Sequence, residues 1–220
     1  MNRNSLGLIS RAAMSAAVAT LLAAALPAVA SAQTAAPAQT AQAPAVPAHA
    51  LSERVLGKAD APVTIIDYSS MTCPHCATFH TDVLPKIKEK YIDTGKVKLV
   101  FRDFPLDRVA LAASAMARCA PEERYFPLLD VLFKSQSQWA RASDPTKALS
   151  QYGKLAGMQQ ATIDACIADQ TLADGILKFR MQGTDEHKVQ STPTFVLNDG
   201  TKIEGAQSIE TFSAAIDKLL

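Results

Sequence analysis

The 220-residue sequence is poor in cysteine, poor in aromatic residues and almost neutral. Its 22 basic and 21 acidic side chains are dispersed along the chain, so the sequence lacks the basic cluster that is typical of nucleic-acid binding. Beyond the N-terminal segment there is no apolar run of the roughly 20 residues that a membrane-spanning helix needs. Only four cysteines are present, and two of them, Cys73 and Cys76, lie three positions apart. Any proposed function must explain this spacing.

The N-terminus has the three parts of a secretory signal. Arg3 and Arg11 lie in a stretch without acidic residues, an apolar run of about 15 residues follows, and Ala30 and Ala32 occupy the small-residue positions of a cleavage site. No two arginines are adjacent there, which favours the general export route over the twin-arginine route. We therefore expect cleavage near Ala32, loss of residues 1–32 and delivery of the mature protein to the periplasm.

Residues 33–50 consist almost wholly of Ala, Pro, Gln and Thr. Pro37, Pro44 and Pro47 interrupt any helix, so we expect a disordered linker in which His49 is an ordinary solvated residue. About 170 residues remain, the size of one domain with a substantial core. Without the two arginines of the leader, 20 basic and 21 acidic side chains remain, and an exported chain of this kind can keep its disulfides.

The remaining chain alternates between strand and helix patterns. The first strand leads into a helix that begins after Thr72, is bent by Pro85 and ends at Gly95. Strands are predicted over residues 61–70, 96–104, 192–198 and 201–206, with the turn-forming pair Asp199-Gly200 between the last two. Helices are predicted over residues 107–120, 121–140, 144–157, 158–170 and 171–188, and a final helix is capped by Ser208. This order predicts an α/β layer fold with a helical insertion of about 85 residues.

The pair in "CPHC" has several possible uses. A c-type haem site needs His directly after the second cysteine, where Ala77 stands. A structural zinc site needs four ligands, and the other two cysteines are far away in the sequence. A soft-metal site for copper, formed by Cys73, Cys76 and His80, stays open as an alternative, although His80 lies on the apolar face of the predicted helix. A purely structural disulfide would close so short a loop that it would gain little from chain entropy.

Redox chemistry explains the placement of the pair best. A strand ends at Ser70, and Cys73 falls at the first turn of the next helix, followed by Pro74 where a missing N–H costs least. Backbone N–H groups at a helix start favour negative charge, so Cys73 is predicted to be a stable thiolate, with His75 as a positive or hydrogen-bonding neighbour. A thiolate is both the attacking and the leaving group in disulfide exchange, and Cys76, one turn deeper, is predicted to be more buried and to resolve mixed disulfides.

With these residues in place, the sequence resembles the DsbA family of thiol–disulfide oxidoreductases over nearly all of residues 52–220. The resemblance rests on "CPHC", on "STPTF" ahead of a strand and on the order of the elements. It implies a thioredoxin-like domain formed by residues 51–106 and 189–220, interrupted by an all-helical domain over residues 107–188. It also implies that the protein introduces disulfides into reduced, secreted client proteins and that a quinone-linked membrane partner re-oxidises it, without a cofactor or a bound metal.

Two further positions take roles from the resemblance. Pro193 matches the cis-proline of the family, which lies against the CxxC pair and leaves the preceding backbone free to pair with an extended client. Asp67 matches the buried acid that relays protons to the deeper cysteine. From the residues alone, an ordinary paired aspartate at the end of a strand is an equal alternative for Asp67.

Thr192, directly before Pro193, departs from the pattern of the best-known oxidases, which carry Val there. Related isomerases and reductases often carry Thr, so a periplasmic isomerase or reductase is the alternative to a dithiol oxidase. Those isomerases add an N-terminal oligomerisation segment, whereas only a Pro-rich linker precedes the domain here. The resemblance therefore favours a monomeric oxidase.

Cys119 and Cys166 lie on the apolar faces of two predicted helices of the insertion. In an oxidising compartment we expect a second, structural disulfide between them. Two separate buried thiols are the alternative.

Overall fold

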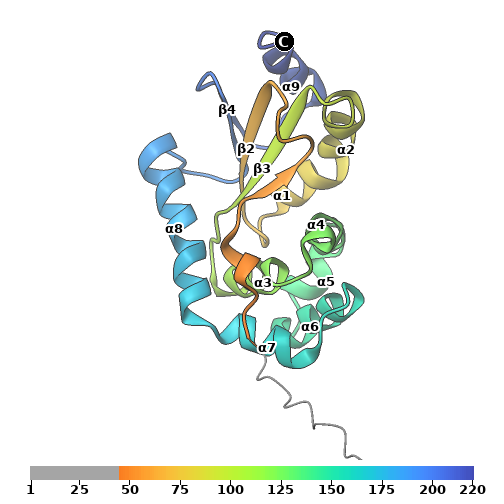
Figure 1. The fold of residues 1–220 in the computed structure, drawn as a ribbon, viewed down its shortest axis with the longest axis vertical. Coiled ribbons are helices and arrows are strands. Elements are labelled where there is room, and N and C mark those ends of the chain that lie inside the picture. The colour runs from red at the N-terminus through yellow and green to blue at the C-terminus, as the bar shows by residue number, and fades with distance from the viewer. Residues whose placement is uncertain (1–44) are drawn as a thin grey trace, which may run out of the picture. The chain divides into compact units, whose positions relative to one another are not determined.

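The computed structural model describes residues 45–220, so the predicted signal at residues 1–32 and most of the predicted linker lie outside the described residues. A five-stranded sheet in the order β1–β3–β2–β4–β5 forms the centre (Figure 1). β2 and β3 are parallel, and the other neighbours pair antiparallel. The four predicted strands are confirmed, whereas β1 was not predicted, because three residues give too short a pattern. The strands are β1 (Arg54–Leu56), β2 (Val63–Ser69), β3 (Val97–Asp103), β4 (Thr194–Leu197) and β5 (Lys202–Glu204).

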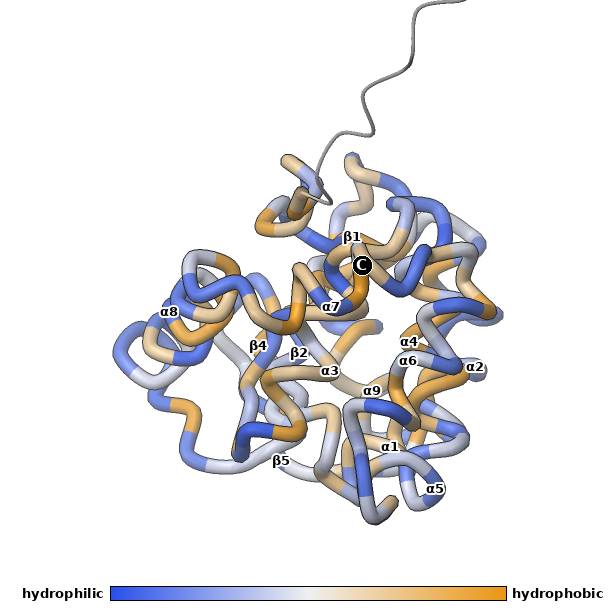
Figure 2. Tube along the Cα trace, turned by 90° about the horizontal axis from the view of Figure 1, so that it is seen from below, coloured by the Kyte–Doolittle hydropathy of each residue, from blue (hydrophilic) through white to orange (hydrophobic). Residues whose placement is uncertain are grey.

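Helices cover both faces of this sheet. α8 (Gln170–His187) lies along one face, and the helices that follow β2 lie on the other together with α9 (Ile209–Ile216) (Figure 1). Hydrophilic and hydrophobic segments alternate along α8, as expected for a helix with one buried side (Figure 2). Side chains of β2 alternate between the faces, so Ile65 and Asp67 point toward the main core and Tyr68 toward a smaller apolar cluster.

The helix that follows β2 is predicted to bend at Pro85, and it is interrupted by wider turns. It consists of α1 (Pro74–Thr78), a π-helical turn η2 (Phe79–Val83), α2 (Leu84–Ile87) and a second π-helical turn η3 (Lys88–Ile92). Pro85 lies in the first turn of α2, directly after the first π turn. The wider turn lets the chain continue past a residue that has no backbone N–H.

The expected helical insertion over residues 107–188 is present and belongs to the same compact unit as the sheet. The prediction of a single helix over 121–140 is wrong, because the helix is interrupted at Ser135. The Ser135 hydroxyl donates to the carbonyl oxygen of Val131 at 2.6 Å. None of the helices within residues 45–220 is long and apolar enough to cross a bilayer. The elements before α8 are α3 (Arg108–Arg118), η4 (Glu122–Arg124), α4 (Tyr125–Lys134), α5 (Gln136–Ala140), α6 (Pro145–Leu155) and α7 (Gln160–Ala168).

The end of the predicted linker is part of the fold, which corrects the boundary at residue 50. Residues Ala48–Leu51 form a 3-10 turn, η1, in which Ala50 is buried. His49 is not an ordinary solvated residue, since its Nε2 lies 3.0 Å from the carbonyl oxygen of Ala120. The composition of this segment gave no sign of these contacts, because they are made largely by backbone atoms.

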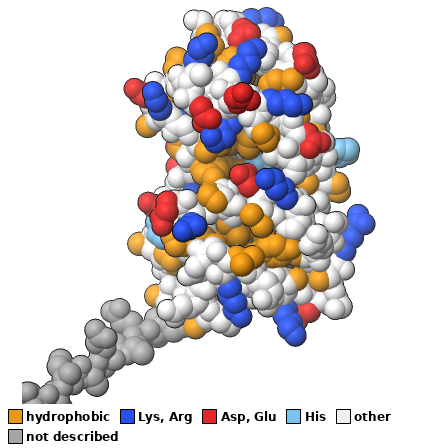
Figure 3. Space-filling model, turned by 90° about the vertical axis from the view of Figure 1, so that its right-hand side faces the viewer, with side chains coloured by type: hydrophobic (Ala, Val, Ile, Leu, Met, Phe, Trp, Pro, Cys, Tyr) orange, Lys and Arg blue, Asp and Glu red, His pale blue; other side chains and the backbone are white. Residues whose placement is uncertain are grey.

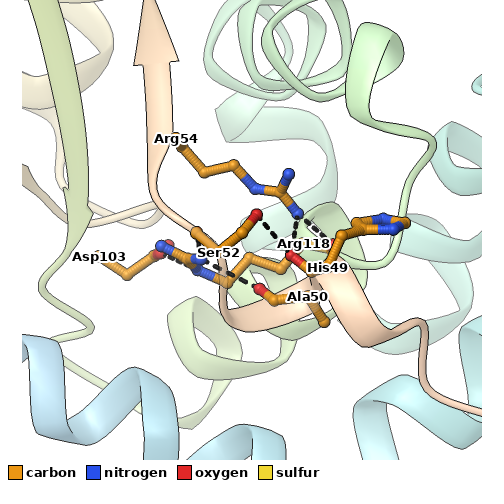
Figure 4. Close-up of polar contacts among 6 residues, drawn as sticks. All are labelled: His49, Ala50, Ser52, Arg54, Asp103 and Arg118. Carbon is orange, nitrogen blue, oxygen red and sulfur yellow. Dashed lines mark hydrogen bonds and ion pairs between the residues drawn. The ribbon is translucent and has the colours of Figure 1, made fainter.

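Arg118, on α3, is completely buried and explains why the N-terminal segment is held (Figure 4). Its Nε donates to Asp103 Oδ2 at 2.5 Å, and its Nη1 donates to the carbonyl oxygens of Ala50 at 3.0 Å and Ser52 at 3.1 Å. Arg54 donates in turn to the carbonyl oxygen of Arg118 at 2.6 Å. A buried charge is tolerated only when it is paired and hydrogen-bonded. The backbone carbonyls of the segment that begins at η1 provide hydrogen-bond acceptors for the buried guanidinium of Arg118.

Cys119 and Cys166 form the expected disulfide, between the end of α3 and α7, and both are buried. Replacing both by Ala is expected to lower the free energy of unfolding by about 4 kcal/mol, since the bond closes a loop with a sequence separation of 47. Urea unfolding followed by the fluorescence of the single tryptophan, the buried Trp139 of the insertion, measures this change. Cys119→Ala alone should lose as much, and an unchanged free energy would contradict a stabilising role.

Candidate active site

The two cysteines of "CPHC" lie at the start of α1, just after the turn that follows β2. Cys73 is the N-cap residue of α1, with Pro74 at the first helical position, and both are placed as the sequence predicts. The backbone N–H of Cys76 donates to Sγ of Cys73 at 3.4 Å, and the carbonyl oxygen of Ser70 accepts from the N–H of Cys73 at 3.1 Å. Both cysteines are free thiols in the structure, so it describes the dithiol form.

The first sulfur is set up to carry a negative charge. The hydrogen bond from the Cys76 thiol is the largest cause that lowers the pKa of Cys73 to about 5. The Thr192 side chain, which can donate to the ionised sulfur, and the backbone N–H groups of Cys76 and His75 lower it further, while burial opposes the shift. His75 therefore acts through its backbone, and its exposed imidazole is not one of these causes.

The second sulfur has the opposite character. Cys76 is completely buried, and burial is the largest cause that raises the pKa of its thiol far above the ordinary value. Its hydrogen bond to Cys73 and the negative charges of Cys73 and Asp67 raise this pKa further, although the N–H of Ser70 donates to its sulfur at 3.5 Å. The pair therefore consists of one sulfur that ionises easily and one that keeps its proton.

The loop before β4 completes the site, because β4 begins beside the end of β2, where Tyr68 pairs with Thr194. The peptide bond between Thr192 and Pro193 is cis, as the resemblance implies, and the Cys73 thiol donates to the carbonyl oxygen of Thr192 at 3.2 Å. The Thr192 hydroxyl is buried and has no hydrogen-bond partner among the described residues in this dithiol form. It is therefore free to donate to Cys73 once that sulfur is ionised.

Gln136, the first residue of α5, is a site residue that the sequence analysis missed. Its amide Nε2 donates to the carbonyl oxygens of Met71 and Cys73, both at 2.9 Å, so the insertion holds the turn that carries the reactive sulfur. A cavity of about 280 Å³ lies beside this contact, between the insertion and Pro74, and Asp107 and Arg141 contribute to its lining. No sequence signal identified Gln136, because its partners are backbone carbonyls 63 and 65 positions away.

Asp67 and His80 form a completely buried pair beneath the cysteines. Asp67 Oδ2 lies 3.0 Å from His80 Nε2, and the hydroxyl of Ser69 donates to Asp67 Oδ1 at 2.5 Å. The imidazole of His80 stacks on Phe133 with ring centres 4.0 Å apart. Asp67 is therefore paired, as one of the two sequence-based views expects, and its charge acts on Cys76, while its role as a proton relay stays a prediction.

The copper alternative finds no support in this geometry. The Nε2 atom of His80 is directed at Asp67 instead of at the two sulfurs. Within residues 45–220, no three or more His, Cys, Asp or Glu side chains gather in an arrangement that would hold a metal ion.

Comparisons with known proteins agree with this geometry. A thioredoxin family model matches residues 49–218. A Rickettsia bellii protein, provisionally named a protein-disulfide oxidoreductase, is 34% identical over 170 residues, which are 77% of this chain and 65% of the relative. The chain thus spans slightly less than two thirds of that relative. Disulfide bond formation protein D of Bacillus subtilis is 29% identical over 156 residues, which are 66% of this chain and 67% of that protein.

Solved structures are similar over more of their length. Alpha-DsbA1 of Wolbachia pipientis is 34% identical, with a TM-score of 0.70 over 76% of this chain and 90% of that chain. BdbD of Bacillus subtilis has the same fold, with 24% identity and a TM-score of 0.68 over 76% of this chain and 92% of that one. The chain therefore belongs to the DsbA family, in which a helical domain is inserted into a thioredoxin-like fold.

Proposed function

We propose that this protein is an exported dithiol oxidase that introduces disulfides into secreted client proteins through Cys73 and Cys76. The difference between the two sulfurs carries this proposal: the pKa of Cys73 is lowered to about 5, and the pKa of Cys76 is raised by burial. Stabilising the thiolate of Cys73 stabilises the reduced protein, and this makes the Cys73–Cys76 disulfide a strong oxidant.

The exchange takes place in two steps. A client thiolate attacks Sγ of Cys73, the Cys73–Cys76 bond breaks, and Cys76 leaves as a thiolate that takes up a proton. A second client thiolate then attacks the client sulfur of the mixed disulfide and releases Cys73 as a thiolate. Two electrons pass from the client to the cysteine pair. Of the two protons lost by the client thiols, one ends on Cys76 and the other enters the solvent, because Cys73 stays ionised at neutral pH.

The surroundings of Cys73 suit an extended, reduced client. The loop with Thr192 and Pro193 lies against the reactive sulfur, and the resemblance assigns backbone pairing with the client to this position. The 280 Å³ cavity beside Pro74 offers a place for a client side chain, with Asp107 and Arg141 at its edge. We assign the proton relay of Cys76 to Asp67, whose charge acts on that sulfur.

The compartment and partner of the proposed oxidase follow from its chemistry. A protein that makes disulfides must work where they persist, and the predicted signal at residues 1–32 would deliver it to the periplasm. After each cycle the dithiol must lose two electrons to another oxidant. We assign this step to a quinone-linked membrane partner on the basis of the resemblance, and we expect the protein itself to be a monomer.

An isomerase or reductase is the second candidate, and Thr192 is the observation that favours it. In the dithiol form the reactive sulfur is hydrogen-bonded to the backbone of this residue. The same threonine also supports the oxidase, because its hydroxyl helps to lower the pKa of Cys73 in the reduced state. The oxidase is preferred, because the lowering of the Cys73 pKa by the hydroxyl acts directly on the thiolate.

Two measurements separate the candidates. In cells, rapid acid quenching followed by alkylation is expected to find the Cys73–Cys76 pair mainly as a disulfide. In refolding assays, the oxidised protein should convert a reduced, multi-disulfide client with one disulfide formed for each protein consumed. A mainly reduced pair in cells, together with strong activity on a scrambled client without added oxidant, would instead identify an isomerase. Cys119 and Cys166 serve as the internal reference, since this disulfide should remain oxidised in either case.

A further inference from the structure

A second cavity opens on a different face of the protein, between α2 and α4. It has a volume of about 370 Å³, and its walls are largely apolar. Figure 3 shows a face on which apolar side chains gather around a hollow, with basic and acidic groups near its edge. The residues that line the cavity are Leu56, His80, Leu84, Pro85, Lys88, Phe126, Pro127, Asp130 and Lys134.

His80 connects this cavity to the buried pair beneath the cysteines. Only 3% of the residue is exposed, and its ring is held by stacking on Phe133 and by an edge contact with Phe101. Its Nε2 faces Asp67, whereas its Nδ1 is buried and has no hydrogen-bond partner among the described residues. One nitrogen of the imidazole thus contacts the carboxylate, and the other lacks a protein partner in a side chain that lines a cavity.

Proton supply is a real difficulty at this site. Cys76 and Asp67 are both completely buried, and Cys73 covers the pair on the client side with only 6% of its own surface exposed. In each cycle Cys76 must nevertheless gain one proton and lose it again. When a client occupies the Cys73 side, water has its best access to the pair through the cavity between α2 and α4.

We propose that His80 is a positioning residue that exchanges protons between the Asp67 carboxylate and water in this cavity, so that Cys76 is protonated from the face opposite to the client. The proposal rests on the proposed function only in so far as Cys76 takes part in disulfide exchange. Its direction, oxidase or isomerase, does not matter, since both directions move the same proton.

The step balances in both directions. When Cys76 leaves as a thiolate, the Asp67 carboxylate accepts the Nε2 proton of His80 and passes a proton to Cys76, so that it ends as a carboxylate again. Nδ1 of His80 takes a proton from a water of the cavity, and the resulting hydroxide leaves to solvent. When Cys76 loses its proton to attack a mixed disulfide, the same transfers run in reverse and return the imidazole to its first tautomer. No net charge accumulates on the buried pair.

The charged groups around His80 allow such an exchange. Asp67 on β2 faces Nε2, while Asp130 and Lys134 on α4 and Lys88 on η3 line the cavity. Burial raises the pKa of Asp130, and interactions with His80, Lys134 and Lys88 oppose this shift. The aromatic rings of Phe133, which stacks on the imidazole, and of Phe101, which meets it edge-on, carry no charge, and the side chain of Asp67 is completely buried.

The reaction of the dithiol protein with Ellman's reagent tests the proposal. In a first phase Cys73 attacks the reagent and releases one coloured nitrothiobenzoate. In a second phase Cys76 loses its proton and attacks Cys73, which releases the second nitrothiobenzoate. His80→Ala is expected to slow the second phase on the order of 100-fold, as for loss of a proton-transfer group, and to leave the first phase unchanged. Added imidazole should restore the second phase in proportion to its concentration, because it enters the space left in the cavity.

His80→Gln is the matched variant. Its amide keeps a donor toward Asp67 but cannot pass a proton on, so the second phase should be slow, should change its pH profile and should not recover with imidazole. Lys134→Gln, which removes a cation at the exposed rim of the cavity, should leave both phases unchanged. A second phase of His80→Gln with the native rate and pH profile would overturn the proposal, and so would a slow His80→Ala that imidazole does not restore. If only the oxidase assignment is wrong, both phases and their dependence on His80 persist.

Discussion

Cys73→Ser is expected to abolish disulfide exchange completely, because Cys73 is 6% exposed and ionises easily, and no other cysteine of residues 45–220 combines these two properties. Cys76 is completely buried, and Cys119 and Cys166 are joined in a buried disulfide. A serine hydroxyl can neither form the mixed disulfide nor ionise near neutral pH. The measurement is the rate at which the oxidised native protein, compared with the variant, converts a reduced peptide dithiol. Any exchange above the uncatalysed rate in Cys73→Ser would contradict the assignment of the nucleophile.

The matched variant Cys76→Ser should behave differently. Its Cys73 keeps a helix start and the backbone N–H groups around it, so it should still attack an oxidised client. Without Cys76 the mixed disulfide has no internal thiol to resolve it and should accumulate as a covalent complex, visible by non-reducing electrophoresis. Full multiple-turnover activity in Cys76→Ser would show that the roles of the two sulfurs are assigned wrongly.

Cys73 of the reduced protein is expected to ionise with a pKa of about 5, four units below the value of 9.0 for an unperturbed thiol. Thiolate absorbance, or the pH dependence of alkylation, measures this value, and Cys73→Ser supplies the baseline. Cys76 should not titrate in the same range, because burial raises the pKa of its thiol. A midpoint close to that of free cysteine would remove the driving force of the proposed oxidase.

The sign of the pH dependence follows from the lowered pKa. Folding holds Cys73 as a thiolate where an unfolded chain would hold a thiol, so the reduced protein gains stability as the pH rises from about 5 to about 9. This gain is complete above the unfolded pKa and is lost as the pH falls to the folded pKa. The oxidised protein has no such thiolate. The difference in unfolding free energy between the reduced and oxidised forms should therefore change with pH between these limits.

Thr192→Val tests whether the Thr192 side chain contributes to the low pKa of Cys73. The Thr192 side chain is one of the groups that lower the pKa of Cys73, so the valine variant should raise that pKa and weaken the oxidant. Thr194→Val is the control, because the Thr194 hydroxyl donates to the carbonyl oxygen of Ser191 at 2.8 Å, in the same loop but away from the sulfur. An equal pKa in the native protein and in Thr192→Val would show that the hydroxyl has no part in stabilising the thiolate.

The sequence predicted those parts of the site that depend on short-range pattern. The run from β2 through Cys73 and Pro74 into α1 is local, and alternation and helix-start chemistry were enough to predict it. Pro193 and the disulfide partners required the resemblance or the redox compartment, since nothing in their spacing brings them together. The structure confirms the pairing of Cys119 with Cys166 that the redox compartment led us to expect.

Contacts between residues far apart in the sequence could not be predicted from local sequence patterns. Gln136 acts through two carbonyl groups, and any residue type could have provided those carbonyls. His80 was predicted to lie on the apolar face of its helix, and it does, but its contact with Asp67 depends on how that helix packs against β2. The linker boundary failed for a similar reason, because residues 48–51 are held by an arginine about 70 positions away whose partners are backbone atoms.

The buried guanidinium of Arg118 has a consequence for the order in which the chain assembles during synthesis. Residues 48–56 are synthesised early, but β1 can pair only after β3 has been made. The carbonyl oxygens of Ala50 and Ser52 find their hydrogen-bond donor, Arg118, only when α3 has also been made. Residues 48–56 therefore complete their contacts later than their position in the chain suggests. The contacts of Ala50 and Ser52 can therefore form only after α3 has been synthesised and has brought Arg118 into place.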